Sequence, residues 1–141
     1  MAVAACPDLC QKAISIYRDV YGRYRALNGD AYPETINVAL NFGRALYKDG
    51  DFSELKEVLR ALLSVQDVQG LHGLQLRWLY ANALRDAENA TLDDLVEAVE
   101  TLDDVSQKWR RMLGPQHPDY PAVENALNRT REALAQARAS K

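Results

Sequence analysis

Apolar residues recur at every third or fourth position along most of this chain, in segments separated by short stretches that carry glycine and proline. This spacing puts the apolar side chains on one face of an α-helix, and no segment keeps the two-residue alternation that is typical of strands. We therefore predict an all-α fold of about six helices. Five of them are expected at about residues 7–26, 33–49, 52–65, 92–112 and 118–139, and the fourth is expected to follow Gly70 and to contain Leu74 to Leu84.

Each of the first five segments carries an apolar stripe that we expect to face a core. The stripes are, in chain order, Ala13, Ile16, Tyr17, Val20 and Tyr24; Ile36, Ala39, Phe42, Gly43 and Leu46; Leu55, Val58, Leu59, Leu62 and Leu63; Leu74, Trp78, Ala81 and Leu84; and Leu95, Val99, Leu102, Val105, Trp109 and Met112. Because the connections between segments are short, consecutive helices are expected to be antiparallel neighbours.

Several of the predicted helix ends carry capping residues. Pro33 followed by Glu34 suits a helix start, because proline fits the first helical position and a carboxylate favours the positive end of the helix dipole. Gly50 is expected to end the second helix, and Thr91 is expected to cap the start of the fifth. These residues indicate the boundaries independently of the apolar pattern.

Composition describes an ordinary soluble chain of 141 residues, long enough for one domain with a buried core. The net charge of −3 argues against broad electrostatic binding of nucleic acid. No apolar run approaches the ~20 residues that a membrane span requires. Residues 1–5 lack the pattern of a signal peptide, so we expect a cytoplasmic protein in which Cys6 and Cys10 are reduced.

One short passage occurs twice in the sequence. Gly29 to Glu34 and Gly114 to Asp119 both read Gly-x-x-aromatic-Pro-acid, and their prolines, Pro33 and Pro118, are 85 residues apart. That distance is roughly two periods of forty-odd residues, which lies within the range of helical repeat proteins. The repeated passage therefore predicts a repeated arrangement of helices.

The segment from Asn41 to Leu55 resembles the core of a tetratricopeptide repeat, with Gly43, Gly50, Phe52 and Leu55 at the characteristic positions. The segment from Tyr80 to Leu102 repeats this pattern more loosely. The passage from Leu113 to Asp119 resembles the inter-repeat linker of the kinesin-light-chain type of these repeats. The resemblance covers roughly residues 10 to 135 and implies an antiparallel helix-pair solenoid.

We read the chain as a single helical-repeat domain over residues 1–141. Its parts are a leading helix (1–27), a first repeat (28–66), a degenerate second repeat (70–112) and a C-terminal capping helix (113–141). The middle linker around Gly70, His72 and Gly73 lacks the proline of the other two. One helix pair cannot bury both of its faces, so neighbouring pairs are expected to stack.

The resemblance implies that the first helix of each repeat lines a concave surface that binds extended peptides. The expected groove residues include Leu40, Gln75, Ala122 and Glu132, together with nine residues that we assign to peptide binding. They are Asn37, Asn41, Arg44, Lys48, Trp78, Asn82, Arg85, Asn125 and Arg129. Asparagine can donate to and accept from a peptide backbone, and arginine grips carboxylates, so we expect the peptide to be acidic.

No residue pattern in the sequence indicates catalysis. His72 and His117 both fall in predicted linkers, and His117 is expected to cap and pack its turn. There is no glycine-rich phosphate loop, nucleophile elbow or metal-ligand motif. We therefore expect a protein that is not an enzyme, with no cofactor, no metal, no nucleic-acid partner and no membrane insertion.

Three functions stay open at this point. The first is an adaptor that binds a peptide, and the second is a structural subunit held permanently in a larger complex through exposed helix faces. Candidates for such faces are Tyr17, Tyr21, Tyr24, Trp109 and Met112. The third is a regulatory domain of a longer chain, and self-association through an uncovered end also stays open.

Overall fold

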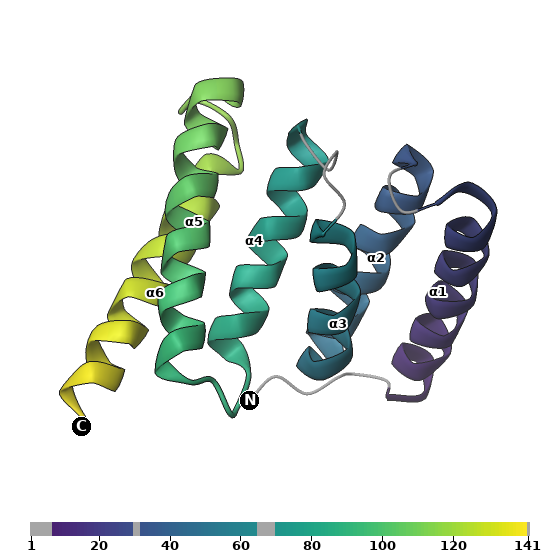
Figure 1. Ribbon diagram of the computed structural model, residues 1–141, viewed down its shortest axis with the longest axis horizontal. Coiled ribbons are helices and arrows are strands. Elements are labelled where there is room, and N and C mark those ends of the chain that lie inside the picture. Colours follow the sequence, from purple (N-terminus) through teal and green to yellow (C-terminus); the bar gives the residue numbers. More distant parts are fainter. Residues whose placement is uncertain (1–6, 30–31, 65–69, 141) are drawn as a thin grey trace. The chain divides into compact units, whose positions relative to one another are not determined.

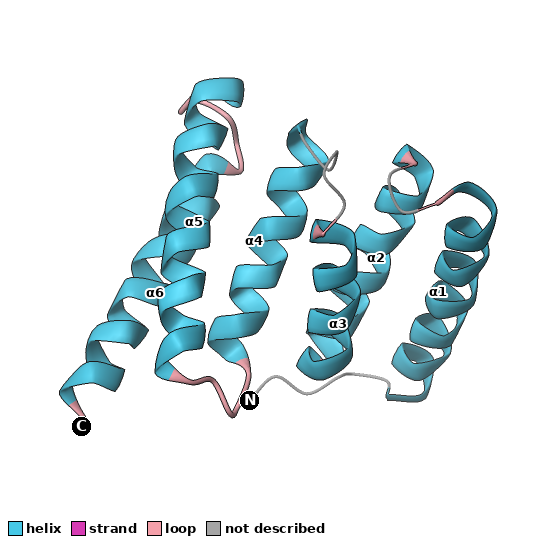
Figure 2. Cartoon of the chain, viewed as in Figure 1, coloured by secondary structure: helices cyan, strands magenta, loops and turns pink. Residues whose placement is uncertain are grey.

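The computed structural model describes residues 7–29, 32–64 and 70–140, and in these residues all regular structure is helical (Figures 1 and 2). The predicted all-α fold with six helices is confirmed for this part of the chain. The helices are α1 (Pro7–Asn28), α2 (Pro33–Asp49), α3 (Phe52–Leu63), α4 (Gly70–Asp86), α5 (Leu92–Leu113) and α6 (Tyr120–Ala139).

The capping residues act as the sequence predicts. Pro33 opens α2 with Glu34 in its first turn, and Gly50 ends the helix with a φ of 82°, where a side chain would be strained. Thr91 and Asp94 form a reciprocal capping box at the start of α5, because each side chain accepts a hydrogen bond from the other residue's backbone N–H.

The two copies of the repeated passage begin with the same backbone geometry. Gly29 and Gly114 have φ values of 84° and 85°. Their N–H groups donate to the carbonyl oxygens of Arg25 and Arg110, four residues earlier, at 2.9 and 3.0 Å. Each glycine thus ends a helix in the same way, although residues 30–31 of the first copy lie outside the described residues.

One predicted boundary lies outside the described residues, and two other assignments differ from the structure. Residue 65, the expected end of the third helix, lies outside the described residues, and α3 is observed to Leu63. α6 begins at Tyr120 rather than near Pro118, because Pro118 belongs to a turn in which the Tyr120 N–H donates to the His117 carbonyl. His72 lies in the first turn of α4 and not in a linker, since its helix already begins at Gly70.

The chain divides into two compact units, Met1–His72 and Gly73–Lys141. In the first, α2 packs against both α1 and α3. The start of α1 meets the end of α2, where the Gln11 amide donates to the Asp49 carboxylate at 3.2 Å. The end of α1 meets the start of α2, where the Thr35 hydroxyl donates to the Tyr24 carbonyl. α1 and α2 are therefore antiparallel, as predicted.

The core of the first unit follows the predicted stripes except in α1. The stripe of α2 is buried as expected, whereas in α1 the buried residues are Ile14 and Tyr21, with Tyr21 packed on Phe42. The predicted core residue Ile16 is 63% exposed, so this assignment was wrong. Ile14 and Ile16 are two residues apart and point to nearly opposite sides of a helix, and the sequence pattern alone favoured the wrong one.

The second unit has a core built around a fully buried tryptophan, Trp109. This residue of α5 clusters with Leu74 of α4 and with Tyr120 and Val123 of α6. α4 and α5 are also joined by the ion pair between Arg77 and Asp104. Further hydrogen bonds and ring contacts tie the three helices together, from Tyr80 to Glu97, from Arg131 to Asp103 and between Trp78 and Trp109.

Candidate functional site

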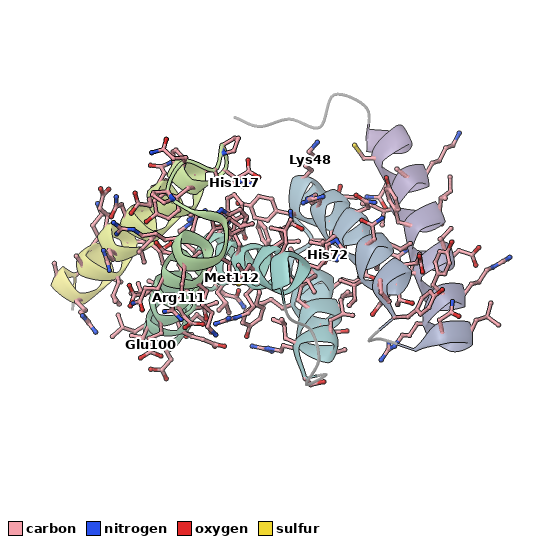
Figure 3. All side chains as sticks on the ribbon, turned by 90° about the horizontal axis from the view of Figure 1, so that it is seen from above. Lys48, His72, Glu100, Arg111, Met112 and His117 are labelled. Carbon is pink, nitrogen blue, oxygen red and sulfur yellow. The ribbon has the colours of Figure 1, made fainter. Side chains whose placement is uncertain are left out.

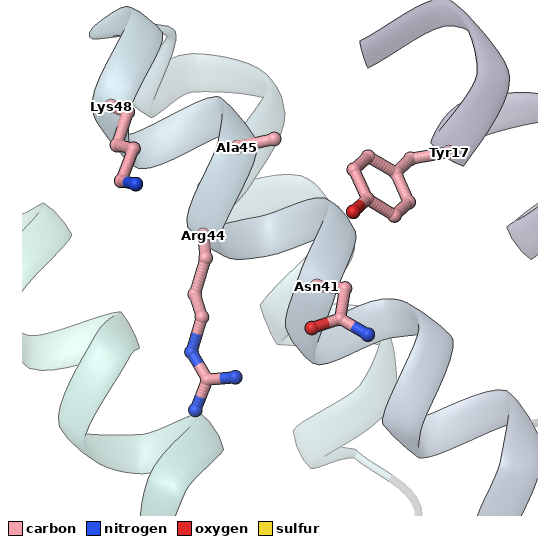
Figure 4. A pocket seen from close by; sticks show the side chains of 5 residues that line it. All are labelled: Tyr17, Asn41, Arg44, Ala45 and Lys48. Carbon is pink, nitrogen blue, oxygen red and sulfur yellow. The ribbon is translucent and has the colours of Figure 1, made fainter. Parts of the chain in front are cut away.

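A shallow pocket opens on the first unit where α1 faces the C-terminal half of α2 (Figure 4). Its cavity volume is about 310 Å³. Three of its lining residues, Asn41, Arg44 and Lys48, are among those that we assigned to peptide binding from the sequence. The other two are Tyr17 of α1 and Ala45 of α2.

Helical spacing explains why these side chains meet. Asn41, Arg44 and Lys48 follow one another at intervals of three and four residues, which places them on one face of α2. The opposite face of the same helix carries buried Phe42 and Leu46 and is held against the core. Packing of the apolar face therefore fixes the direction in which the polar face points.

The pocket is rich in hydrogen-bond donors and positive charge. Arg44 and Lys48 are exposed, and neither has an ion-pair partner within the part of the chain that the structure describes. Among the lining residues there is no carboxylate. Such a pocket is suited to an anionic group, because the cations are not already neutralised by the protein.

Arg18, by contrast, is an arginine of the same unit that is committed to the fold. Its guanidinium binds the Glu54 carboxylate at 2.9 and 2.7 Å and lies over the Phe42 ring. The hydrogen bond from Arg18 lowers the pKa of Glu54, and the same bond raises the pKa of Arg18. This ion pair joins α1 to α3 and leaves Arg18 occupied.

Arg85 also differs from what we expected of it. We placed it on an open groove, but its side chain is only 7% exposed and pairs with Asp86 at 2.8 Å. It also donates to the Thr130 hydroxyl at 3.2 Å and to the Ala126 carbonyl of α6. Arg85 therefore ties α4 to α6, and its assignment to peptide binding is corrected to a structural role.

The two other predicted residues of α4 are half-buried. Trp78 meets Trp109 edge to face, with 5.6 Å between ring centroids. The Trp78 Nε1 and Asn82 Oδ1 atoms are buried, and neither has a hydrogen-bond partner among the described residues. They are one turn apart on α4, and a binding role for them stays a prediction.

The remaining predicted residues are not gathered into the pocket. Asn37, on α2, and Asn125 and Arg129, on α6, are exposed. Leu40, which we expected to face the groove, is buried in the core. Within the described residues, the pocket therefore brings together three of the nine residues that we assigned to peptide binding.

Sequence reasoning missed Tyr17 as a pocket residue. We placed it in the core stripe of α1, whereas its side chain is half-buried and its hydroxyl is turned toward α2 (Figure 4). A signal was available, because tyrosine combines an apolar ring with a polar end that usually stays at the edge of a core.

His117 has the structural role that we expected. Its Nδ1 atom accepts a hydrogen bond from the Asp119 N–H at 3.1 Å, and its ring packs edge to face on Trp109. Figure 3 labels His117 beside the turn between α5 and α6. Over the described residues, no group of three or more His, Cys, Asp and Glu side chains is arranged to hold a metal ion.

Comparisons with protein-family models, curated proteins and solved structures found no match for this chain. The resemblance to tetratricopeptide repeats therefore stays a prediction from the sequence. Of the helices in the described residues, none combines the length and the apolar character needed to cross a membrane. Cys10 is a half-buried free cysteine, and Cys6 lies outside the described residues.

Proposed function

We propose that this chain is a non-catalytic interaction module that binds an acidic peptide segment of a protein partner. The observation that carries the proposal is the pocket of the first unit, where Arg44 and Lys48 stand without a carboxylate partner in the described residues. Both cations lie on one face of α2, and no carboxylate lines the pocket beside them. Two cations in one pocket without a carboxylate support a site for a negatively charged ligand.

The side chains of the pocket suit the parts of a peptide. The guanidinium of Arg44 offers paired donors that match the two oxygens of a carboxylate. The amide of Asn41 both donates and accepts, as a backbone peptide group requires. Lys48 adds a second charge one turn further along α2.

Selection from a library of random peptides, with the full chain as bait, tests the proposal. We expect the selected peptides to be enriched in Asp and Glu. Substitution of both Arg44→Glu and Lys48→Glu should lower their affinity at least tenfold, because attraction becomes repulsion. Selection of no peptide, or of peptides whose binding ignores the double substitution, would contradict the proposal.

The double variant Arg110→Glu with Arg111→Glu is a matched control. Both arginines are exposed on α5, and they lie in its last turn as Lys48 does in α2. The control thus makes the same change of charge and a similar change near a helix end, at residues that do not line the pocket. It should leave peptide affinity within about twofold, because neither arginine lines the pocket.

A second candidate is a structural subunit that is held through exposed apolar side chains. Three such side chains support it: Ile16 at 63% and Leu27 at 81% exposure on α1, and Met112 at 54% on α5 (Figure 3). Two of the residues that we expected to serve this role, Tyr21 and Trp109, are buried and are corrected to core residues. The test is whether the chain is incorporated into a stable complex. This candidate would be favoured if Ile16→Lys with Leu27→Lys abolished the incorporation while Arg44→Glu with Lys48→Glu left it intact.

A further inference from the structure

Resting on the proposed function, we infer that the pocket of the first unit takes the phosphate of a phosphoserine or phosphothreonine side chain in the bound peptide. The charge count leads to this inference. The lining holds two cations, Arg44 and Lys48, and no anion. A carboxylate brings one negative charge, whereas a phosphate monoester brings about −1.5 to −2 at neutral pH and therefore neutralises both cations.

The donors of the pocket also exceed what one carboxylate can use. Arg44 has five N–H donors, Lys48 has three, Asn41 has two, and the Tyr17 hydroxyl adds another. A carboxylate has two oxygen atoms, while a phosphate monoester has three terminal oxygens that accept strong hydrogen bonds. The surplus of donors over acceptors is smaller for the phosphate.

The size of the pocket is compatible with this inference. The cavity volume of about 310 Å³ is roughly ten times the ~30 Å³ that a water molecule occupies in the liquid. The pocket therefore has room for a phosphoryl group together with the side chain that carries it.

The lining residues are expected to contribute unequally to binding of the phosphate. Lys48 lies in the last turn of α2, where it also faces the negative end of the helix dipole. Arg44 lies one turn earlier, so more of its charge is available to a ligand. Tyr17 comes from α1 and supplies a neutral donor on the other wall of the pocket (Figure 4).

Nuclear magnetic resonance titrations of the isotope-labelled full chain can test the inference with three probes. They are the N-acetyl methylamide of O-phosphoserine, the N-acetyl methylamide of glutamate, and inorganic phosphate. Amide shifts in residues 41–48 report on the pocket. We expect the phosphoserine probe to bind at least tenfold more tightly than the glutamate probe, and more tightly than inorganic phosphate because its side chain and backbone amides add contacts.

Variants locate the binding. Arg44→Gln should weaken binding of the phosphoserine probe about tenfold, Tyr17→Phe should weaken it two- to fourfold, and the control Arg110→Gln should leave it unchanged. Equal affinity for the phosphoserine and glutamate probes would overturn the inference, as would loss of binding in the control alone. Equal affinity for the phosphoserine probe and inorganic phosphate would assign the pocket to free phosphate and overturn the peptide source.

Failure of this inference can be told from failure of the proposed function. If unmodified acidic peptides bind through Arg44 and Lys48 but the phosphoserine probe is no better than the glutamate probe, the inference fails and the proposed function stands. If the phosphoserine probe binds as expected but no peptide is selected from the library, the proposed function fails while the anion preference of the pocket stands.

Discussion

Replacing Arg85 should unfold the second unit more easily without changing the pocket of the first. Arg85 joins Asp86, Thr130 and the carbonyl of Ala126, and its side chain is 7% exposed. Arg85→Gln removes the charge and shortens the side chain, so these contacts between α4 and α6 are lost. Asp86 then loses the Arg85 guanidinium, although its 28% exposure lets water take part of that role.

The expected loss of stability lies between two known limits. Removing one partner of a fully buried ion pair costs about 3–5 kcal/mol, whereas an exposed pair is worth less than about 1 kcal/mol. Arg85 is buried and Asp86 is partly exposed, and Thr130 keeps a hydrogen bond to Ala126 at 2.7 Å. We therefore expect a loss of about 2–3 kcal/mol in the free energy of unfolding.

Urea unfolding followed by tryptophan fluorescence measures this loss selectively. Both tryptophans of the chain, Trp78 and Trp109, lie in the second unit. With a slope of about 2 kcal/mol per molar urea, the midpoint should fall by about 1 M or slightly more. Circular dichroism reports on both units at once and shows whether the first is affected.

Arg129→Gln is the matched control for this prediction. Arg129 is an exposed arginine of α6, next to Thr130 in the sequence, and such surface substitutions usually stay within about 0.5 kcal/mol. If Arg85→Gln and Arg129→Gln shifted the fluorescence midpoint equally, the structural role of Arg85 would be refuted. The original assignment of Arg85 to peptide binding would then regain support.

Two other predictions concern the helix ends and the response to acid. Thr91→Ala should lower the free energy of unfolding by about 1 kcal/mol, because it removes half of the capping box with Asp94. Thr91→Ser should restore this free energy. Equal urea midpoints for the two variants would count against the cap. The hydrogen bond from Arg18 holds the Glu54 pKa below its ordinary value of 4.5. The ionised Glu54 carboxylate therefore stabilises the folded state above that pH, and this stabilisation is lost as pH falls through the folded-state pKa. Urea titrations from pH 7 to pH 3 should show this loss of unfolding free energy, which is at most about 1 kcal/mol for such an exposed pair. Glu54→Gln should make the dependence of the unfolding free energy on pH shallower. An unchanged dependence on pH would refute the contribution of Glu54.

Most of the fold could be predicted from the sequence because its signals are local. Helical periodicity depends only on which residues lie three or four apart, and the ends at Gly50 and Thr91 depend on single capping residues. Gly29 and Gly114 have nearly equal φ values and the same backbone hydrogen bond, so the first residue of the repeated passage ends a helix in the same way in both copies. The pattern failed in α1, because either of two apolar faces could have turned inward and only packing against α2 decides between them.

The candidate site was predictable only in part, because it depends on neighbours that periodicity does not identify. Arg44 and Arg85 were assigned to the groove by the same rule, and both lie on the predicted first helix of a repeat. Arg44 is exposed, whereas Arg85 meets Asp86 and the α6 residue Thr130 and is buried. An arginine is available to a ligand only where the protein leaves its charge unpaired. That condition separates Arg44 from Arg85, and it makes the pocket of the first unit the place where a test of binding should begin.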